Sequence, residues 1–191
     1  MIRRPNHDNS RREDHHGSQM KLAEVGNLGR DVWTRAQPGG LESHRHPPGF
    51  WELCWLERGR MDWQVDGLPA SMHGGDCFLT RPGELHGGQG GIMHSGALCW
   101  ITVDLRRLPG LAPARARALR CDFNALRLRS FPASAAVGAA FSAILAEFRR
   151  SDAQSPTVVR ATLHVLLIAI LRAANPTHAY SNVLDCSVHR H

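Results

Sequence analysis

The sequence lacks the long apolar runs that carry proteins into or across membranes. Its most apolar stretch, 158–174, is interrupted by Arg160, Thr162, His164 and Arg172. We therefore expect no membrane-spanning helix. The arginines near the N-terminus are followed by no apolar segment, which argues against a secretory signal peptide. These absences predict a cytoplasmic protein with no membrane partner.

Cysteine is scarce and unpatterned. The five cysteines stand at positions 54, 77, 99, 121 and 186, an odd number without a CxxC pair. This arrangement excludes a disulfide framework and a zinc knuckle as the basis of the fold. We interpret the cysteines as small buried apolar side chains.

Lysine is almost absent, with one residue against 22 arginines, and the formal net charge is +6. Seven arginines fall between Leu105 and Ser130, beside Pro109, Gly110 and Pro113 but with few aromatic residues. A nucleic-acid interface would place such charges on one face beside aromatic side chains or a docking helix. We therefore predict a solvated connector here and no direct contact with nucleic acid.

Between about residues 31 and 104, short apolar runs alternate with Gly and Pro at intervals of eight to twelve residues. This spacing is typical of an all-β sandwich or barrel. The predicted strands cover 50–57, 61–65, 76–80 and 98–105. Arg58-Gly59 is expected to end the first of them, and Asp66-Gly67 to form a tight hairpin turn.

The apolar period then changes from two to 3.6. Two amphipathic helices are predicted, with these stripes: Val137, Phe141, Ile144, Leu145 and Phe148, then Val159, Leu163, Leu166, Leu167 and Ile170. Ser155 is the expected N-cap of the second helix. The chain thus divides into a flexible polar arm (1–20), a barrel (21–131), an antiparallel helical hairpin (132–175) and an unstructured tail (176–191).

The residues that carry chemistry are His44, His46, Glu52 and His86. His44 and His46 are two positions apart, so on an extended strand both imidazoles point to one face. Glu52 starts the next strand, and His86 follows the Pro82-Gly83 turn. Three imidazoles and a carboxylate that converge inside a barrel would form a site for a divalent transition metal such as Fe, Mn, Ni or Zn, with open coordination positions.

This spacing resembles the cupin superfamily. Its first motif, HxH followed by Glu and Gly, is matched by His44, His46, Glu52 and Gly59, and its second by Gly75, Pro82, Gly83 and His86. Gly90 stands where an asparagine often follows, and the proline and glycine are adjacent. The resemblance implies a mainly β fold, an RmlC-like jelly-roll barrel, followed here by the two-helix hairpin.

With those departures, the sequence resembles the N-terminal ligand-binding and dimerisation domain of AraC-type transcriptional regulators. The order of its elements, a barrel, then a connector, then two helices, is similar to that domain as well. The resemblance covers roughly residues 28–173. It implies a sensor barrel for a small-molecule effector and a homodimer formed by the hairpin. Such regulators normally continue into a helix-turn-helix domain, whereas here a tail without helical periodicity follows. We expect a regulatory module without its own DNA-binding domain.

Alternatives remain open at this point. The four-residue site could be a metal-free pocket for an organic ligand, with His44, His46, Glu52, Trp63 and His86 as contacts. Trp51 and Trp55 alternate with Glu52, so they should face away from the site and pack on the helices. The runner-up function is a metal-dependent cupin enzyme, a dioxygenase or isomerase. A third hypothesis is an oligomerisation fragment that forms mixed dimers with a full-length regulator.

Overall fold

The computed structural model describes residues 10–14, 20–34, 37–38 and 42–175. Within these ranges the helices are α1 (Pro113–Ala125), α2 (Ala135–Arg150) and α3 (Ser155–Ala174), and a 3-10 turn covers Gln89–Gly91. The strands are β1 (Ser10–Asp14), β2 (Val25–Trp33), β3 (Gln37–Pro38), β4 (Phe50–Val65), β5 (Leu68–His73), β6 (Asp76–Thr80), β7 (His86–Gly88), β8 (Ile92–Met93), β9 (Gly96–Asp104) and β10 (Ser130–Pro132).

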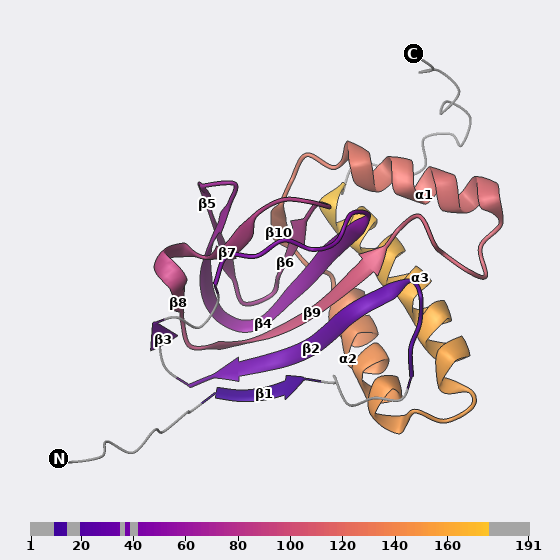
Figure 1. Ribbon diagram of the computed structural model, residues 1–191, viewed down its shortest axis with the longest axis horizontal. Helices are drawn as coiled ribbons and strands as arrows, with labels where there is room; N and C mark the ends of the chain where they lie inside the picture. Colours follow the sequence, from indigo (N-terminus) through magenta and orange to yellow (C-terminus); the bar gives the residue numbers. More distant parts are fainter. Residues whose placement is uncertain (1–9, 15–19, 35–36, 39–41, 176–191) are drawn as a thin grey trace.

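Strand β4 organises the barrel (Figure 1). The main sheet runs β1-β2-β9-β4-β6-β10, and β5 and β7 pair with the second half of β4. All of these pairings are antiparallel. The predicted mainly β barrel followed by a two-helix hairpin is confirmed, as is the tight turn at Asp66-Gly67, where both residues have positive φ.

The prediction that a strand ends at Arg58-Gly59 is wrong. The chain continues through these residues as one strand, with a register shift against β9 between Leu56 and Arg58. Gly59 adopts φ +98°, and a Cβ there would lie 2.3 Å from the Ser95 carbonyl oxygen. Glycine therefore allows the strand to bend and change partners where another residue would clash. The bulge also changes which alternate positions face inward.

Two predictions of irregular structure need correction. Residues 10–14, expected within a flexible arm, form β1 and pair with β2, so backbone hydrogen bonding organises a segment that lacks an apolar pattern. The connector contains helix α1, which begins with Pro113 at a first-turn position and buries Leu119 and Phe123. The remainder of the arm, 1–9 and 15–19, and the predicted tail 176–191 lie outside the described residues.

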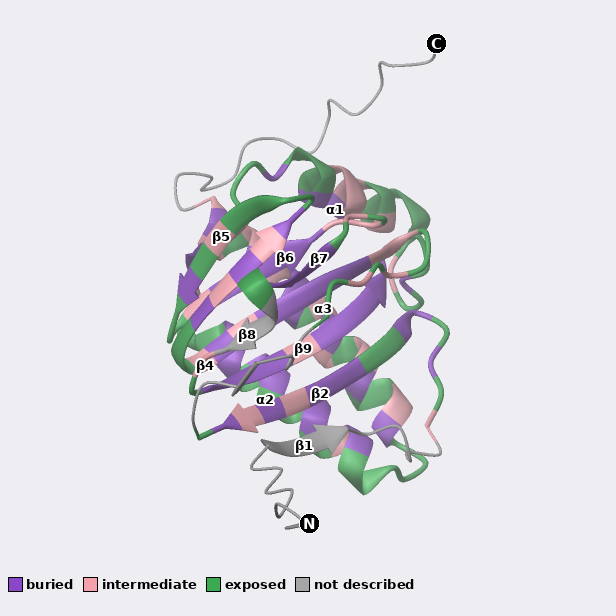
Figure 2. Cartoon of the chain, turned by 60° about the vertical axis from the view of Figure 1, so that its left-hand side comes forward, coloured by how far each residue is buried: buried purple, intermediate pink, exposed green. Residues whose placement is uncertain are grey.

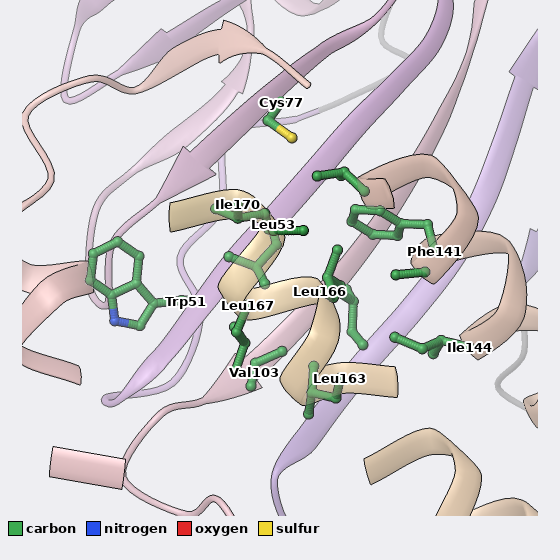
Figure 3. Close-up of a cluster of buried hydrophobic side chains, with 14 of the residues drawn as sticks. Trp51, Leu53, Cys77, Val103, Phe141, Ile144, Leu163, Leu166, Leu167 and Ile170 are labelled. Carbon is green, nitrogen blue, oxygen red and sulfur yellow. The ribbon is translucent and has the colours of Figure 1, made fainter. Parts of the chain in front are cut away.

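Helices α2 and α3 cover one face of the sheet (Figures 1 and 3). Their predicted stripes are buried, and Trp55 stacks on Phe141 with ring centroids 6.4 Å apart. Gly138 permits this contact, because a Cβ there would lie 2.7 Å from the Trp55 ring. As predicted, Trp51 also faces the helical side, where it meets Phe123 edge-on at 5.6 Å.

Helix α3 is long and apolar enough to cross a membrane, contrary to our expectation for this stretch. Its two arginines, Arg160 and Arg172, lie towards the ends and leave eleven central residues without a charged side chain other than His164. In the structure the α3 stripe lies against the sheet (Figure 3). A core helix meets the same length and composition criteria as a membrane span.

The turn between the two helices is held by Asp152, not by the predicted N-cap Ser155. Asp152 accepts hydrogen bonds from the backbone N–H groups of Gln154 and Ser155 at 2.9 and 3.0 Å. Ser155 is the first helical residue and is fully buried, and its hydroxyl donates to Glu147 at 2.9 Å. Asp152 therefore satisfies backbone N–H groups that the start of α3 leaves unpaired, and Ser155 ties that start to the end of α2.

Candidate functional site

The buried apolar side chains form two clusters, one on each side of the sheet, and strand β9 of that sheet is buried along most of its length (Figure 2). The helical side contains Trp51 and Leu53 from β4 together with the α2 and α3 stripes. The barrel side contains Trp63, Phe78, Met61, Met72 and their neighbours. Glu52 lies on the barrel side, because it alternates with Trp51 and Leu53. The candidate site lies at this inner face.

The structure brings His44, His46, Glu52 and His86 together, although they are up to 42 positions apart in the sequence. One ligand atom from each lies within 4.8 Å of those of all the others. The His44 and His86 ring centroids are 4.4 Å apart, and His46 lies 4.9 Å from His86. Glu52 Oε2 lies 3.0 Å from His86 Nε2 and 3.6 Å from His46 Nε2.

Backbone pairing, not the predicted strand, aligns the two HxH imidazoles. His44 forms an isolated bridge with His86, donating its N–H to the His86 carbonyl at 2.9 Å and accepting in return at 3.0 Å. His46 follows in extended chain without strand pairing. Pro47-Pro48-Gly49 then turns the chain into β4, with the Phe50 N–H donating to the Pro47 carbonyl. The bridge fixes His44 beside His86 because the two backbones pair directly.

Two of the imidazoles are oriented by backbone carbonyls. His44 Nδ1 lies 3.0 Å from the Glu42 carbonyl oxygen, and His86 Nδ1 lies 3.0 Å from that of Glu84. Because a carbonyl only accepts, each Nδ1 must carry the proton. The Nε2 atom of each neutral ring then presents a lone pair. This carbonyl-to-imidazole arrangement is the usual support of a metal-binding histidine.

The charge state of the cluster follows from its burial. The Glu52 side chain is 7% exposed and that of His86 is fully buried. Burial alone would raise the pKa of Glu52, but the adjacent His46 and His86 outweigh it and bring that pKa to about 2. Burial would lower the pKa of His86, yet contact with the Glu52 carboxylate raises it above its ordinary value. Glu52 is therefore an anion at neutral pH.

The residues fit a bound cation. The Nε2 atoms of His46 and His86 are buried without a hydrogen-bond partner among the described residues. A neutral His86 would aim its lone pair at a carboxylate oxygen 3.0 Å away, a repulsive contact unless a proton or metal ion lies between them. A separation near 3 Å is also expected for neighbouring ligands of one metal ion with bonds of about 2.1 Å. Three nitrogens and one oxygen suit a divalent transition metal.

Trp63 forms the wall beside this cluster. Its ring centroid lies 6.2 Å from that of His86, and its other neighbour is Phe78, stacked at 5.4 Å and 8°. The indole N–H points to Met72 Sδ at 3.3 Å. Trp63 faces inward as predicted. The bulge makes this possible, because inward positions are even-numbered before it and odd-numbered after it.

Sequence reasoning missed three residues around the site. The fully buried Thr80 donates its hydroxyl to Glu52 Oε2 at 3.2 Å. Glu84 orients His86 and is itself held by Arg129 through two hydrogen bonds of 2.6 and 2.8 Å. The position of Glu84 between the Pro82-Gly83 turn and His86 was the available signal. No sequence signal pointed to Arg129, because it lies among the arginines of the predicted solvated connector.

The buried cysteines have no place in the cluster. Cys54, Cys77 and Cys99 are buried and free, and Cys121 is half-buried. Burial raises the pKa of both Cys77 and Cys99 to about 12, so these thiols stay protonated and unreactive. The interpretation as buried apolar side chains is confirmed for Cys54, Cys77 and Cys99, whereas Cys121 is only half-buried and Cys186 lies outside the described residues.

Three solved structures illustrate what the chain is similar to. The AraC-like transcriptional activator CuxR is 13% identical, with a TM-score of 0.45, and the match covers 75% of this chain and 51% of that one. A cupin 2 conserved barrel domain protein from Leptotrichia buccalis is 12% identical, with a TM-score of 0.40 over 52% of this chain and 43% of that one. A predicted oxalate decarboxylase from Thermotoga maritima is 17% identical, with a TM-score of 0.35 over 54% and 98%.

The chain spans about half the length of the first two of these proteins. A search of curated proteins found no match. The model of the AraC-like ligand binding domain matches residues 36–167, which is more than half of the chain and includes the whole candidate site. This match confirms the resemblance read from the motifs. The chain belongs to the AraC-like ligand-binding domain family, with a cupin-type barrel followed by helices.

Proposed function

We propose that this chain is the small-molecule-sensing and dimerisation module of a cytoplasmic transcriptional regulator. The observation that carries the proposal is the convergence of His44, His46, Glu52 and His86 on the inner face of the barrel. The family match supports a binding role for that barrel. An effector would contact these four residues and the neighbouring Trp63.

We further propose that the four side chains hold a divalent transition metal, Fe, Mn, Ni or Zn. His44, His46 and His86 would supply Nε2 and Glu52 a carboxylate oxygen. A bound metal with open positions offers an effector a Lewis-acidic contact point. The chain's own residues would support this site. Two backbone carbonyls orient the imidazoles of His44 and His86, Thr80 donates to the Glu52 carboxylate, and Trp63 would exclude water from one side.

Helices α2 and α3 supply the proposed dimer contact. An apolar groove of about 380 Å³ runs between their outer faces, lined by Ala136, Ala139, Ala140, Ala143, Ala161, Thr162 and Val165. Val158 and Val165 are 40% and 55% exposed beside it. Small residues on one helix pair allow a second pair to approach closely, and a bare apolar face favours a partner. We propose a second copy of this chain as that partner.

Contact with DNA is not part of the proposed role of these elements. A helix-turn-helix unit needs a polar recognition helix that enters the major groove. Helix α3 is apolar around much of its circumference, and its inner stripe packs against the barrel. The module would act on transcription through a DNA-binding partner or domain.

Isothermal titration tests the sensing role. The panel contains sugars and aromatic acids, each titrated into metal-free protein and into protein loaded with Ni²⁺. At least one ligand is expected to bind with a stoichiometry of one per chain, and a His46→Ala variant to lose that binding. Failure of the whole panel to bind either form would overturn the proposal. Turnover of a bound ligand would instead favour the cupin enzyme.

Sedimentation velocity tests the dimer. Val165→Glu places a charge in the α2–α3 groove and is expected to convert a dimer into a monomer at micromolar concentration. Leu68→Glu is the matched control, since Leu68 is 72% exposed at the β4–β5 turn on another part of the molecule. A native chain that sediments as a monomer would refute the dimer and leave the sensor proposal standing.

A further inference from the structure

The turn that carries His86 is tied by its side chains to the segment that starts the helical hairpin. Glu84 and Arg129 form a bidentate ion pair, with Nη1 to Oε2 at 2.6 Å and Nη2 to Oε1 at 2.8 Å. The two side chains are 15% and 26% exposed. A paired, half-buried contact of this geometry is stronger and more directional than a surface ion pair.

On the site side, Glu84 acts through its backbone. Its carbonyl oxygen accepts from His86 Nδ1 at 3.0 Å. Its carboxylate also accepts from the Arg81 N–H at 2.7 Å, which closes the 81–84 turn. The His86 ring is therefore connected through the Glu84 backbone and the ion pair to Arg129.

On the hairpin side, Arg129 stands directly before β10. Its guanidinium donates to the Leu79 carbonyl at 3.0 Å, and its own carbonyl accepts from the Leu79 N–H at 2.9 Å. Strand β10 then pairs with β6, the Ala133 N–H donates to the Gly75 carbonyl, and α2 begins at Ala135. Only five residues separate Arg129 from α2: three form β10, Ala133 donates to Gly75, and the Ser134 carbonyl accepts from the Val137 N–H.

A second tie reaches the end of α1. Arg81 Nη2 donates to the Leu126 carbonyl at 2.6 Å, and Leu126 is the C-cap of that helix. The 81–86 turn is therefore anchored both to the end of α1 and to the segment that leads through β10 into α2. Within the described part of the chain, the side-chain partners of Glu52 are His46, His86 and Thr80, which all lie within the barrel.

We propose that the Glu84–Arg129 ion pair is the regulatory link that transmits occupancy of the His44, His46, Glu52, His86 site to helices α2 and α3. This inference rests on the proposed function, since it assigns a regulation to that site. Glu84 and Arg129 are positioning residues: neither touches the ligand, and each acts through His86 or through β10. A coupling of this kind requires that the site's two states differ in how they hold the turn.

Hydrogen exchange read by mass spectrometry tests the link. The site is perturbed in two ways: by Ni²⁺ binding, and without any ligand by His86→Ala. Both perturbations are expected to change exchange in peptides from α2 as well as from the barrel. In Arg129→Gln the change in α2 should fall to less than half of its native size, while the change in the 81–88 segment persists. Arg129→Lys, which keeps the charge without the bidentate geometry, should restore part of it.

Arg127→Gln is the matched control, since Arg127 is an exposed arginine two residues away. It should transmit both perturbations at native size. Glu84→Gln should reproduce Arg129→Gln, and combining the two should add nothing, because both break one link. If the ion pair only stabilised the fold, Arg129→Gln would instead raise hydrogen exchange equally with and without Ni²⁺ and with and without His86→Ala.

Full transmission in Arg129→Gln would overturn the link. So would a native response confined to the barrel. If Ni²⁺ fails to bind, the metal proposal falls while the His86→Ala comparison still decides whether the link exists. The two failures are therefore distinguishable.

Discussion

The two faces of strand β4 pack equally well but contain different chemistry. Towards the helices, Trp51, Leu53 and Trp55 pack in a cluster of aromatic and aliphatic side chains. Towards the barrel interior, the same strand presents Glu52 beside the imidazoles of His46 and His86 and then Trp63 against Phe78. Strand β4 thus separates a core on the helical side, which stabilises the fold, from a core on the barrel side, which also contains the proposed binding site. Mutations on the two faces should differ in what they change, not in how much they destabilise.

The largest expected effect is on stability. Phe141→Ala on the helical face and Trp63→Ala on the barrel face should each lower the free energy of unfolding by about 3–5 kcal/mol, because each opens a cavity in a packed core. Urea denaturation measures both. Only Trp63→Ala should also weaken Ni²⁺ binding. Equal weakening by Phe141→Ala would erase the contrast between the faces.

Loss of an imidazole should be the next largest effect. His86→Ala removes a ligand and should lower Ni²⁺ affinity by at least about 100-fold, the upper end of what loss of a supporting residue does. Titration calorimetry measures the affinity. His94→Ala is the control, because His94 contacts Asp62 and lies outside the cluster. Similar affinity in His86→Ala and native protein would remove His86 from the site.

A smaller effect is expected at the hairpin turn. Ser155→Ala leaves the Glu147 carboxylate without its buried hydroxyl donor and should cost about 1–2 kcal/mol of stability. It should leave Ni²⁺ affinity unchanged, because Ser155 and its partner Glu147 lie at the hairpin turn and are not part of the four-residue site. Thermal unfolding and calorimetry together give both numbers. A changed affinity would show that the two faces are not independent at this point.

The smallest effect is the change in stability of the metal-free chain between pH 6 and pH 8. The pKa of Glu52, about 2 against an ordinary 4.5, gives stability that is present above pH 4.5 and lost as the pH falls towards 2. The raised pKa of His86 gives stability that is full below 6.5 and lost as the pH rises through the folded value. Urea midpoints in EDTA should therefore fall from pH 6 to pH 8, and less so in His86→Gln. Parallel declines in both proteins would contradict this assignment.

Sequence reasoning recovers the fold well where periodicity is strong. The stripes of α2 and α3 repeat every 3.6 residues, and β6 and β9 are short apolar runs close to turn residues, so these elements were predictable. The single strand β4 was not, because Arg58-Gly59 looks like a stop and the bend depends on contacts with Ser95 that are distant in sequence. Helix α1 was hidden by Pro113, by Pro109-Gly110 before it, and by its arginines.

The site was predictable from motif spacing, but its support was not. His44, His46, Glu52 and His86 could be named in advance, since their spacing follows a known pattern. Thr80 and Arg129 could not, because each acts through a hydrogen bond across the fold that leaves no local signature, whereas Glu84 orients His86 from two residues away and had only its position after the Pro82-Gly83 turn as a signal. The alignment of His44 with His86 likewise depends on a backbone bridge.

X-ray absorption spectroscopy of Ni²⁺-loaded protein tests the central claim most directly. We expect one nickel per chain, with nitrogen and oxygen as its directly bound atoms. We also expect imidazole scattering from three histidines in the native protein and from two in His86→Ala. Substoichiometric nickel, a sulfur ligand, or an imidazole count that is unchanged in the variant would contradict it.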